Sequence, residues 1–302
     1  MSRIRIFFTN LAQRNLFAPL KEHQCSASNT TLITGDAGLE KKMNDMDVAA
    51  EVFGAMRDAR VLLRREPVRS IVGGDAVLYC ECLSTVINSH GRQLRPVQFI
   101  PSLERLQLIG AFDRHVFRQA ITLLRSMPEV RLGINVSAQS AVADIAWEAM
   151  LHLVERAPDV ATRLVVEITE TAPLDAGQGR RFAQRLRQAG CRVAIDDFGV
   201  GYGVETAIRI QTPDIIKIDG SFVAAARRGE TYLARLVRLV RLASELAGEV
   251  VVEGIEQQED LTHARECGAK WAQGRLLDES QDRVKQGHVD RTAATRHAGG
   301  EI

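Results

Sequence analysis

Acidic and amide side chains recur where short apolar, β-branched runs of this chain end. The runs read YCECL, INVSAQ, VEITET, IDDFG, IIKID and VVVEG. Inward-facing residues at the carboxyl ends of barrel strands surround one common cavity, so these side chains are expected to converge there. The residues that chemistry would use at these six ends are Glu81, Asn135, Glu167, the pair Asp196–Asp197, Lys217 and Glu253.

Oxygen donors of this kind favour a hard divalent cation. Carboxylates that converge on one rim repel each other and resist ionisation unless cations neutralise them. Carboxylates plus one amide, with no His or Cys at these positions, select Mg²⁺ or Mn²⁺ over zinc. The adjacent Asp196 and Asp197 suit a two-metal site that activates water and holds a phosphoryl oxygen. The pattern predicts metal-assisted phosphodiester hydrolysis.

Two further residues have expected roles in that chemistry. Lys217 is a fixed cation that would position the water or stabilise transition-state charge. Glu253 would complete a metal shell or act as the general base. Residues i and i+2 of a strand share a face, so Asp219 is expected to point the same way as Lys217.

Each motif by itself also fits a plain structural role. A single Glu at a strand end is often only a polar rim residue. Asp196–Asp197 before Phe-Gly fits a helix-capping turn, because Asp is favoured at helix N-caps. Lys217 and Asp219 fit a simple ion pair on one face. Six strand ends in series that obey one rule favour the site over these separate explanations.

Strand and helix patterns alternate along most of the chain, and they must position these residues. Helical spacing of apolar residues marks segments such as FDRHVFRQAITLLRSM, and eight strands are expected from RVLLRREPVRSI to AKWAQGRLL. Repeated strand–helix units predict an α/β protein with a parallel sheet. Eight strands favour closure into a TIM-like (β/α)8 barrel over an open, doubly wound sheet.

Changes in composition along the chain predict the domain boundaries. Residues 1–45 show no sustained period and are predicted to be an irregular N-terminal extension. Residues 46–277 are predicted to form the barrel domain. Residues 278–302 are polar with a glycine-rich end and are predicted to be a disordered tail.

Overall charge and apolar content exclude several classes of protein. The 302 residues are 25% charged and 45% hydrophobic, as in a soluble globular protein, and the net charge is +1. A net charge this close to zero gives no electrostatic indication that a nucleic acid polymer or a membrane surface is the partner. No apolar run approaches the roughly 20 residues that span a bilayer. The five cysteines form no CxxC pair, which predicts a reducing, cytoplasmic compartment.

The motifs, in this order, resemble the EAL domain, the family of bacterial phosphodiesterases of cyclic di-GMP. Glu81-Cys82-Leu83 resembles the EAL signature with Cys in place of Ala, and INVSAQS, VEITET, IDDFGVGYG, IKIDGSFV, VEGIE and AQG resemble the family's later blocks. The resemblance covers about Ala59 to Leu277. It implies a TIM-like barrel whose first strand is antiparallel, a two-metal site for Mg²⁺ or Mn²⁺, hydrolysis of cyclic di-GMP to linear pGpG, and a homodimer.

The resemblance also assigns roles to single residues. Lys217 would orient the water, and Glu253 would support the metal or the water. Glu170 and Glu256 would brace the loop after Asp197. The remaining implied roles are metal ligation by Glu81, Asn135, Glu167, Asp196, Asp197 and Asp219, and substrate contact by Gln273.

The chain departs from the family pattern at three places. The family reads EALxR, with an arginine that contacts the dinucleotide, and here that position is Thr85, on the same strand face as Glu81. The loop GVGYGVETAIRIQ lacks the family's usual serine pair, and Arg275 stands where an aromatic residue is usual. The retained metal ligands favour an active enzyme. Thr85, Arg275 and the loop favour the alternative, a degenerate module that binds the nucleotide or a protein partner without turnover.

Overall fold

The computed structural model describes residues 44–169 and 174–278. All of them belong to one compact unit of the chain, Met43–Ile302. The N-terminal extension predicted for residues 1–45 lies outside the described residues except for 44 and 45. The tail predicted for residues 278–302 lies outside them except for 278. Both segments therefore stay predictions.

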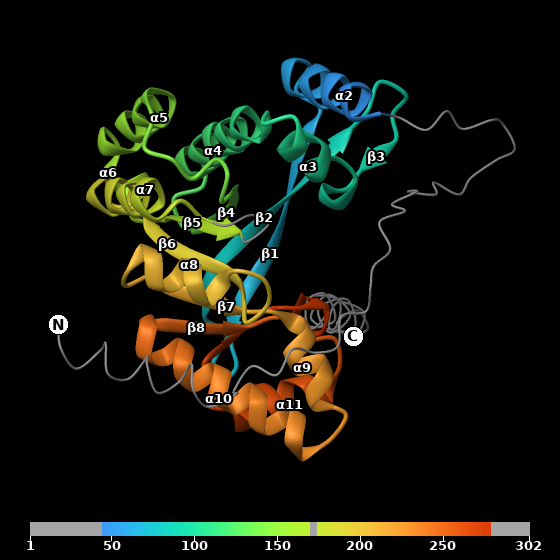
Figure 1. Ribbon diagram of the computed structural model, residues 1–302, viewed down its shortest axis with the longest axis vertical. Coiled ribbons are helices and arrows are strands. Elements are labelled where there is room, and N and C mark those ends of the chain that lie inside the picture. Colours follow the sequence, from blue (N-terminus) through green and yellow to red (C-terminus); the bar gives the residue numbers. More distant parts are fainter. Residues whose placement is uncertain (1–43, 170–173, 279–302) are drawn as a thin grey trace, which may run out of the picture. The chain divides into compact units, whose positions relative to one another are not determined.

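Nine strands form one sheet in the described residues (Figure 1). The runs that the sequence singled out, rich in β-branched and apolar residues, are its main members. In chain order the strands are β1 (Val61–Ser70), β2 (Val77–Ile87), β3 (Gln93–Leu94), β4 (Leu132–Ser137), β5 (Leu164–Thr169), β6 (Arg192–Phe198), β7 (Ile215–Ile218), β8 (Glu249–Val252) and β9 (Trp271–Ala272).

The sheet closes on itself. Its order is β1-β9-β8-β7-β6-β5-β4-β2-β3, and β1 also pairs with β2, so eight strands form a ring and β3 extends β2 at its end. Neighbours from β2 through β4 to β9 are parallel, whereas β1 is antiparallel to both β2 and β9. The eight-stranded barrel and its antiparallel first strand are confirmed. The short strand β3 was not predicted.

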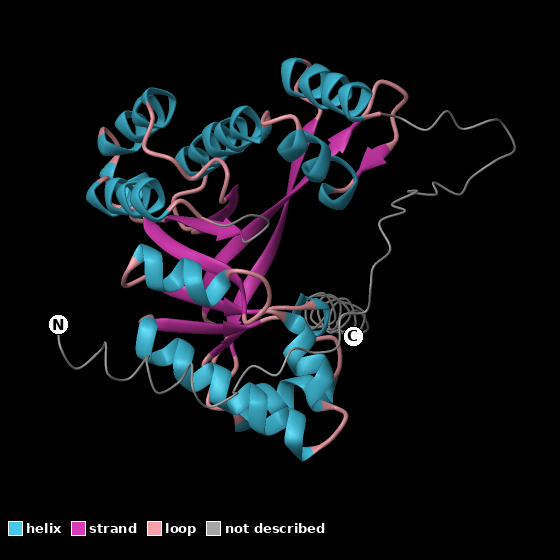
Figure 2. Ribbon diagram, in the orientation of Figure 1, coloured by secondary structure: helices cyan, strands magenta, loops and turns pink. Residues whose placement is uncertain are grey.

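Helices surround the strands (Figure 2). Their apolar residues recur at three- and four-residue spacing; in α4, for example, Phe112, Val116, Ala120 and Leu124 are all buried. The helices are α2 (Asp45–Arg57), α3 (Pro96–Arg105), α4 (Ile109–Ser126), α5 (Ile145–Glu155), α6 (Pro158–Ala161), α7 (Ala176–Gln188), α8 (Gly203–Ile210), α9 (Gly220–Ala226), α10 (Glu230–Leu246) and α11 (Gln258–Glu266).

The inside of the barrel is divided into an apolar and a polar layer. A small apolar cluster fills one end, and most of its members are fully buried. On the parallel strands, the residue two positions after a member of this cluster, toward the carboxyl end, faces inward as well. These are the polar residues predicted from the sequence, so the fold places them in one layer. The apolar cluster consists of Val68, Leu78, Tyr79, Val165, Ala194, Ile215 and Val251, with Trp271 packed against it.

Across the residues that the structure describes, no helix is both long and apolar enough to cross a membrane.

Gly133 on β4 gives a test of how tightly the interior is packed. A Cβ at this position would lie 2.1 Å from Oε1 of Glu167 and 2.5 Å from the ring of Tyr79, and both of those side chains are fully buried. We expect Gly133→Ala to lower the free energy of unfolding by about 1–3 kcal/mol, as overpacked cores do. Urea denaturation measures this change. The control is Gly177→Ala on α7, where the new Cβ meets only ordinary contacts at 3.5 Å; an equal loss in both variants would contradict the argument.

Candidate metal centre

The ammonium group of Lys217 lies among four carboxylates. Lys217 is fully buried on β7, and the carboxylates come from β2, β5, β6 and the residue that follows β8. Because each pair is close and shielded from water, the cluster behaves as one electrostatic unit. The distances from Nζ are 2.6 Å to Glu167, 2.8 Å to Glu253, 3.0 Å to Glu81 and 3.1 Å to Asp196.

Lys217 alone cannot balance this charge. Two overlapping groups have carboxylate oxygens within 4.8 Å of one another: Glu81, Glu167 and Asp196, and then Asp196, Asp197 and Glu253. Together these are five carboxylates against one ammonium, which leaves four negative charges when all are ionised. Two divalent cations would neutralise that remainder, and buried charge of this density is tolerated only when it is paired.

Unpartnered oxygens around the cluster fit a cation as well. Nδ2 of Asn135 donates to Oε1 of Glu81 at 2.6 Å, and Nε2 of Gln273 donates to Oε2 of Glu81 at 2.7 Å. The amide oxygens of Asn135 and Gln273, and Oε1 of Glu167, are buried without a hydrogen-bond partner among the described residues. Buried acceptors normally have partners. The donor set is all oxygen, which suits a hard cation.

Asp197 reaches the site through an unusual backbone conformation. In a regular strand Asp196 and Asp197 would point to opposite faces. Asp197 instead has a φ of +53°, and the pairing register of β6 with β7 shifts between Ile195 and Phe198. Asp is one of the few residues that tolerate this left-handed region. The bulge therefore aims two adjacent carboxylates at one place, which strand alternation alone does not predict.

Burial and mutual repulsion set the protonation of the cluster. Burial raises the pKa of Glu167 to about 8, and burial with repulsion from Asp196 raises the pKa of Asp197 to about 6. Burial also favours the neutral form of Glu81, but Lys217 and the two amides outweigh it and lower its pKa. Burial opposes the ammonium of Lys217, yet the surrounding carboxylates hold its pKa well above its usual value. Lys217 therefore stays charged.

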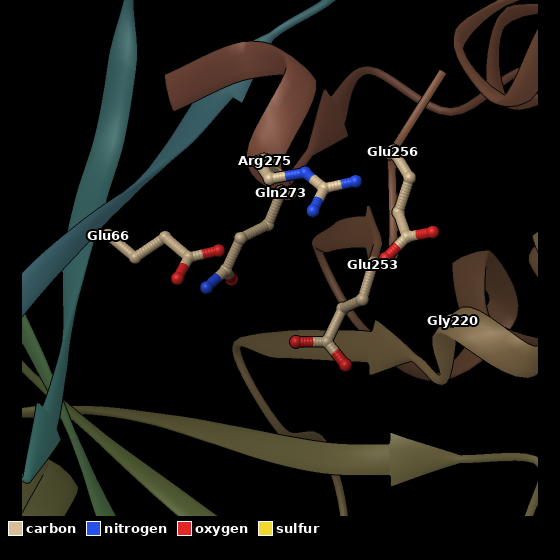
Figure 3. Close-up of a pocket in the computed structure, with 8 residues that line it drawn as sticks. Glu66, Gly220, Glu253, Glu256, Gln273 and Arg275 are labelled. Atoms are coloured by element: carbon tan, nitrogen blue, oxygen red, sulfur yellow. The ribbon is translucent and has the colours of Figure 1, made fainter. Parts of the chain in front are cut away.

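A cavity of about 380 Å³ opens beside the cluster (Figure 3). Glu253 and Gln273 line it, so the cavity gives access to the carboxylates from outside. Glu66 on β1 also lines it and points toward Gln273, and the Cα register pairs Glu66 with Glu81. The sequence argument missed Glu66. Its position two residues before the interior residue Val68 is the signal that would have found it.

Comparison with known proteins identifies this architecture. The profile of the EAL domain matches residues 49–280. The chain belongs to the EAL domain family.

Individual relatives support the assignment. The cyclic di-GMP phosphodiesterase NbdA of Pseudomonas aeruginosa is 27% identical over 269 residues, which are 86% of this chain and 34% of that protein. PdeL of Escherichia coli, also named a cyclic di-GMP phosphodiesterase, is 31% identical over 203 residues, 65% of this chain and 56% of PdeL. The chain thus spans about a third of NbdA and just over half of PdeL.

Solved EAL domains share the fold. The FimX EAL domain of Pseudomonas aeruginosa, determined bound to c-di-GMP, aligns with a TM-score of 0.64 and 25% identity over 76% of this chain and 93% of that one. An EAL domain protein from Listeria monocytogenes aligns with a TM-score of 0.66 and 23% identity over 75% and 90% of the two chains.

The structure places only some of the remaining predicted site residues of the EAL domain near this centre. Asp219 lies just past the end of β7, so strand alternation does not apply to it; its Oδ1 accepts from the backbone N of Ser221 and caps α9 at 3.0 Å. The ion pairs that Lys217 makes are with four other carboxylates, and Asp219 lies outside both carboxylate groups of the described residues. Glu256 lines the cavity. Thr85 is half-buried on β2 and does not line it. Glu170 lies outside the described residues.

Replacing Asp197 separates its charge from its conformation. Asn tolerates the left-handed region, so Asp197→Asn is expected to keep the fold and to weaken Mn²⁺ binding roughly tenfold or more, as even supporting partners of metal ligands do. Asp197→Val puts a β-branched residue at positive φ and is expected to lower the Tm as well. Calorimetric Mn²⁺ titration and thermal unfolding measure the two effects. Equal Tm values for both variants would contradict the conformational part.

The raised pKa of Glu167 predicts how the stability of the metal-free protein depends on pH. The folded state holds this proton up to about pH 8, whereas the unfolded chain releases it near the ordinary value of 4.5. Folding is therefore favoured by this group at low pH, and the advantage is lost as pH rises through about 8.

In EDTA we expect the Tm to fall between about pH 5 and pH 8, and to fall less in Glu167→Gln, which cannot titrate. Mn²⁺ should raise the Tm of the wild type more at pH 8 than at pH 6, because at the lower pH it must displace the proton. Parallel pH profiles for wild type and Glu167→Gln would contradict this assignment.

Proposed function

We propose that this EAL domain hydrolyses cyclic di-GMP to linear pGpG. The observation that carries the proposal is the pair of overlapping carboxylate groups around Lys217, which meets a cavity at the carboxyl ends of the barrel strands. That face of a (β/α)8 barrel is where its enzymes place their active sites. The names of the relatives NbdA and PdeL support the choice of substrate.

Mg²⁺ or Mn²⁺ would be the metal of this reaction. Glu81, Asn135, Glu167 and Asp196 would hold one ion, and Asp197 would hold the second, with Asp219 beside it. Two such ions supply an activated water and withdraw charge from a phosphoryl oxygen. An all-oxygen donor set selects these ions over zinc.

The residues of the chain divide the remaining work. Lys217 stays protonated, so it serves as a fixed cation that aligns the carboxylates and the water and is not the base. Glu253 both contacts Lys217 and lines the cavity, which places a carboxylate between the cluster and the substrate. Its expected role is to accept the proton of the attacking water. Water then adds to phosphorus as the ester bond to the 3′ oxygen breaks. The 3′ oxygen takes up a proton to become a hydroxyl, and the linear product keeps a 5′ phosphate.

The second candidate function is nucleotide binding without turnover. The FimX EAL domain was determined with c-di-GMP bound, and position 85 of this chain carries Thr in place of the family's arginine. Weaker substrate contact beside a complete carboxylate cluster is compatible with either function. The cluster favours the enzyme, because a receptor gains nothing from five mutually repelling carboxylates.

The proposal includes a cytoplasmic location, a homodimer and Glu256 bracing the loop after Asp197. The location follows from the substrate, an intracellular messenger of bacteria. The family resemblance is the support for the dimer and for Glu256, and light scattering on the purified chain measures the oligomeric state.

A turnover assay tests the proposed function. Purified protein with cyclic di-GMP and Mn²⁺ is expected to produce pGpG, detected by chromatography, and EDTA is expected to stop the reaction. Glu81→Gln keeps the shape of a residue that contacts Lys217, Asn135 and Gln273 but loses its charge, and its rate is expected to fall about 100-fold or more.

Arg241→Gln is the matched control, since Arg241 is 84% exposed on α10, and it is expected to leave the rate unchanged. Nucleotide binding by the wild type without any linear product would establish the second candidate function. Absence of both binding and product would refute both candidates.

A further inference from the structure

The cavity that receives the substrate is rich in negative charge. Three carboxylates line it, from Glu66, Glu253 and Glu256. Each phosphodiester of a cyclic dinucleotide also carries a negative charge. Metal ions bound on the cluster side would attract the reacting phosphate, but the second phosphate also has to be held against these carboxylates. A cation at the cavity wall would offset this repulsion and strengthen binding.

Lys217 cannot be that cation. It is fully buried, its ammonium is in contact with four carboxylates, and it does not line the cavity. Thr85 cannot be that cation either, because a hydroxyl carries no charge and Thr85 is not among the residues that line the cavity. Among the described residues that line it, Arg275 carries the only positive charge.

The backbone that carries Arg275 is held firmly in place. Ile255 N donates to the carbonyl of Gln273 at 3.0 Å, and Leu276 N donates to the carbonyl of Ile255 at 3.0 Å, so hydrogen bonds pin the chain on both sides of Arg275. Gly274 has a φ of +152°, and a Cβ there would lie 2.4 Å from the backbone of Ile255. This close approach fixes where the next side chain begins.

The side chain of Arg275 extends over the cavity from this anchored segment. In Figure 3 its guanidinium points away from Glu66 and toward the side where Glu253 and Glu256 lie. Arg275 directly follows Gln273-Gly274, and Gln273 donates to Glu81 of the metal cluster. One short segment thus connects the cluster to a cation at the cavity wall.

We propose that Arg275 binds a phosphodiester group of the substrate and supplies the positive charge that Thr85 does not. This inference rests on the proposed function, because it takes cyclic di-GMP as the ligand. Guanidinium groups bind phosphate through two parallel N–H···O bonds, which adds direction to charge. Arg275, which departs from the family pattern, is then a replacement for the family's arginine at a different position of the rim.

The test compares Arg275→Gln with the control Arg241→Gln. Binding of cyclic di-GMP is measured by calorimetry in EDTA, where the metal-assisted reaction stops, and KM and kcat are measured with Mn²⁺. Loss of a charge-assisted hydrogen bond is expected to raise Kd and KM by roughly tenfold to a hundredfold, with a much smaller change in kcat. Arg275→Lys keeps the charge but lacks the paired donors. Its Kd and KM are expected to lie between those of Arg275→Gln and those of the control Arg241→Gln.

A double substitution separates substrate binding from a structural role. If Thr85 and Arg275 occupy alternative positions for one cation, Thr85→Arg is expected to recover most of the affinity lost in Arg275→Gln and to change the wild type much less. Tm and Mn²⁺ affinity are expected to stay at their wild-type values in Arg275→Gln.

Three results would overturn the inference. Unchanged Kd and KM in Arg275→Gln, with wild-type turnover intact, would refute the role of Arg275 and leave the proposed function standing. A lower Tm with no recovery by Thr85→Arg would assign Arg275 a structural role. Absence of nucleotide binding and turnover in the wild type would refute the proposed function, and the role of Arg275 with it.

Discussion

The geometry of the site depends on one ammonium group placed among four carboxylates, three of them buried and one, Glu253, half-buried at the cavity. Lys217 holds the carboxylates together, yet it neutralises only one of them. The remaining charge opposes folding unless protons or cations balance it, which explains why burial and repulsion raise the pKa values of Glu167 and Asp197. The apolar residues buried in the large hydrophobic core and in the smaller cluster inside the barrel offset this cost. The contacts within such a site do not stabilise it by themselves. The large, closed fold around it supplies the free energy that keeps these side chains together.

Much of this centre could be predicted from the sequence because it follows from local patterns. A β-branched run predicts a strand, the residue at its end lies at the rim, and alternation assigns the face. These rules correctly gave eight barrel strands and brought Glu81, Asn135, Glu167 and Lys217 together. The ring closes through long-range pairing of β1 with β2 and β9, and only the likeness to a known family indicated the antiparallel direction of β1.

Strand alternation alone does not account for three positions near the site, because each depends on how a strand ends, bulges or pairs. Asp219 lies beyond the end of β7 and caps a helix, so counting by two did not apply. The carboxylate of Asp197 joins the cluster only because a bulge and a positive φ redirect it. Glu66 lies on β1, which runs in the opposite direction. On this strand the residues nearer the rim therefore precede the interior residue Val68 in the sequence. Each of these positions depends on where a strand ends or on which strand it pairs with. A short sequence motif does not determine either property.

The left-handed backbone at Asp197 has a consequence for how proteins of this design diverge. Only Gly, Asn and Asp occupy that region at low cost, so few residues can replace Asp197 without strain. The codons of Asp and Asn differ by a single base. One point mutation can therefore remove a carboxylate from the second of the two groups without placing a strained residue at this φ. The backbone conformation at this position thus favours the one substitution that changes charge with little change in shape.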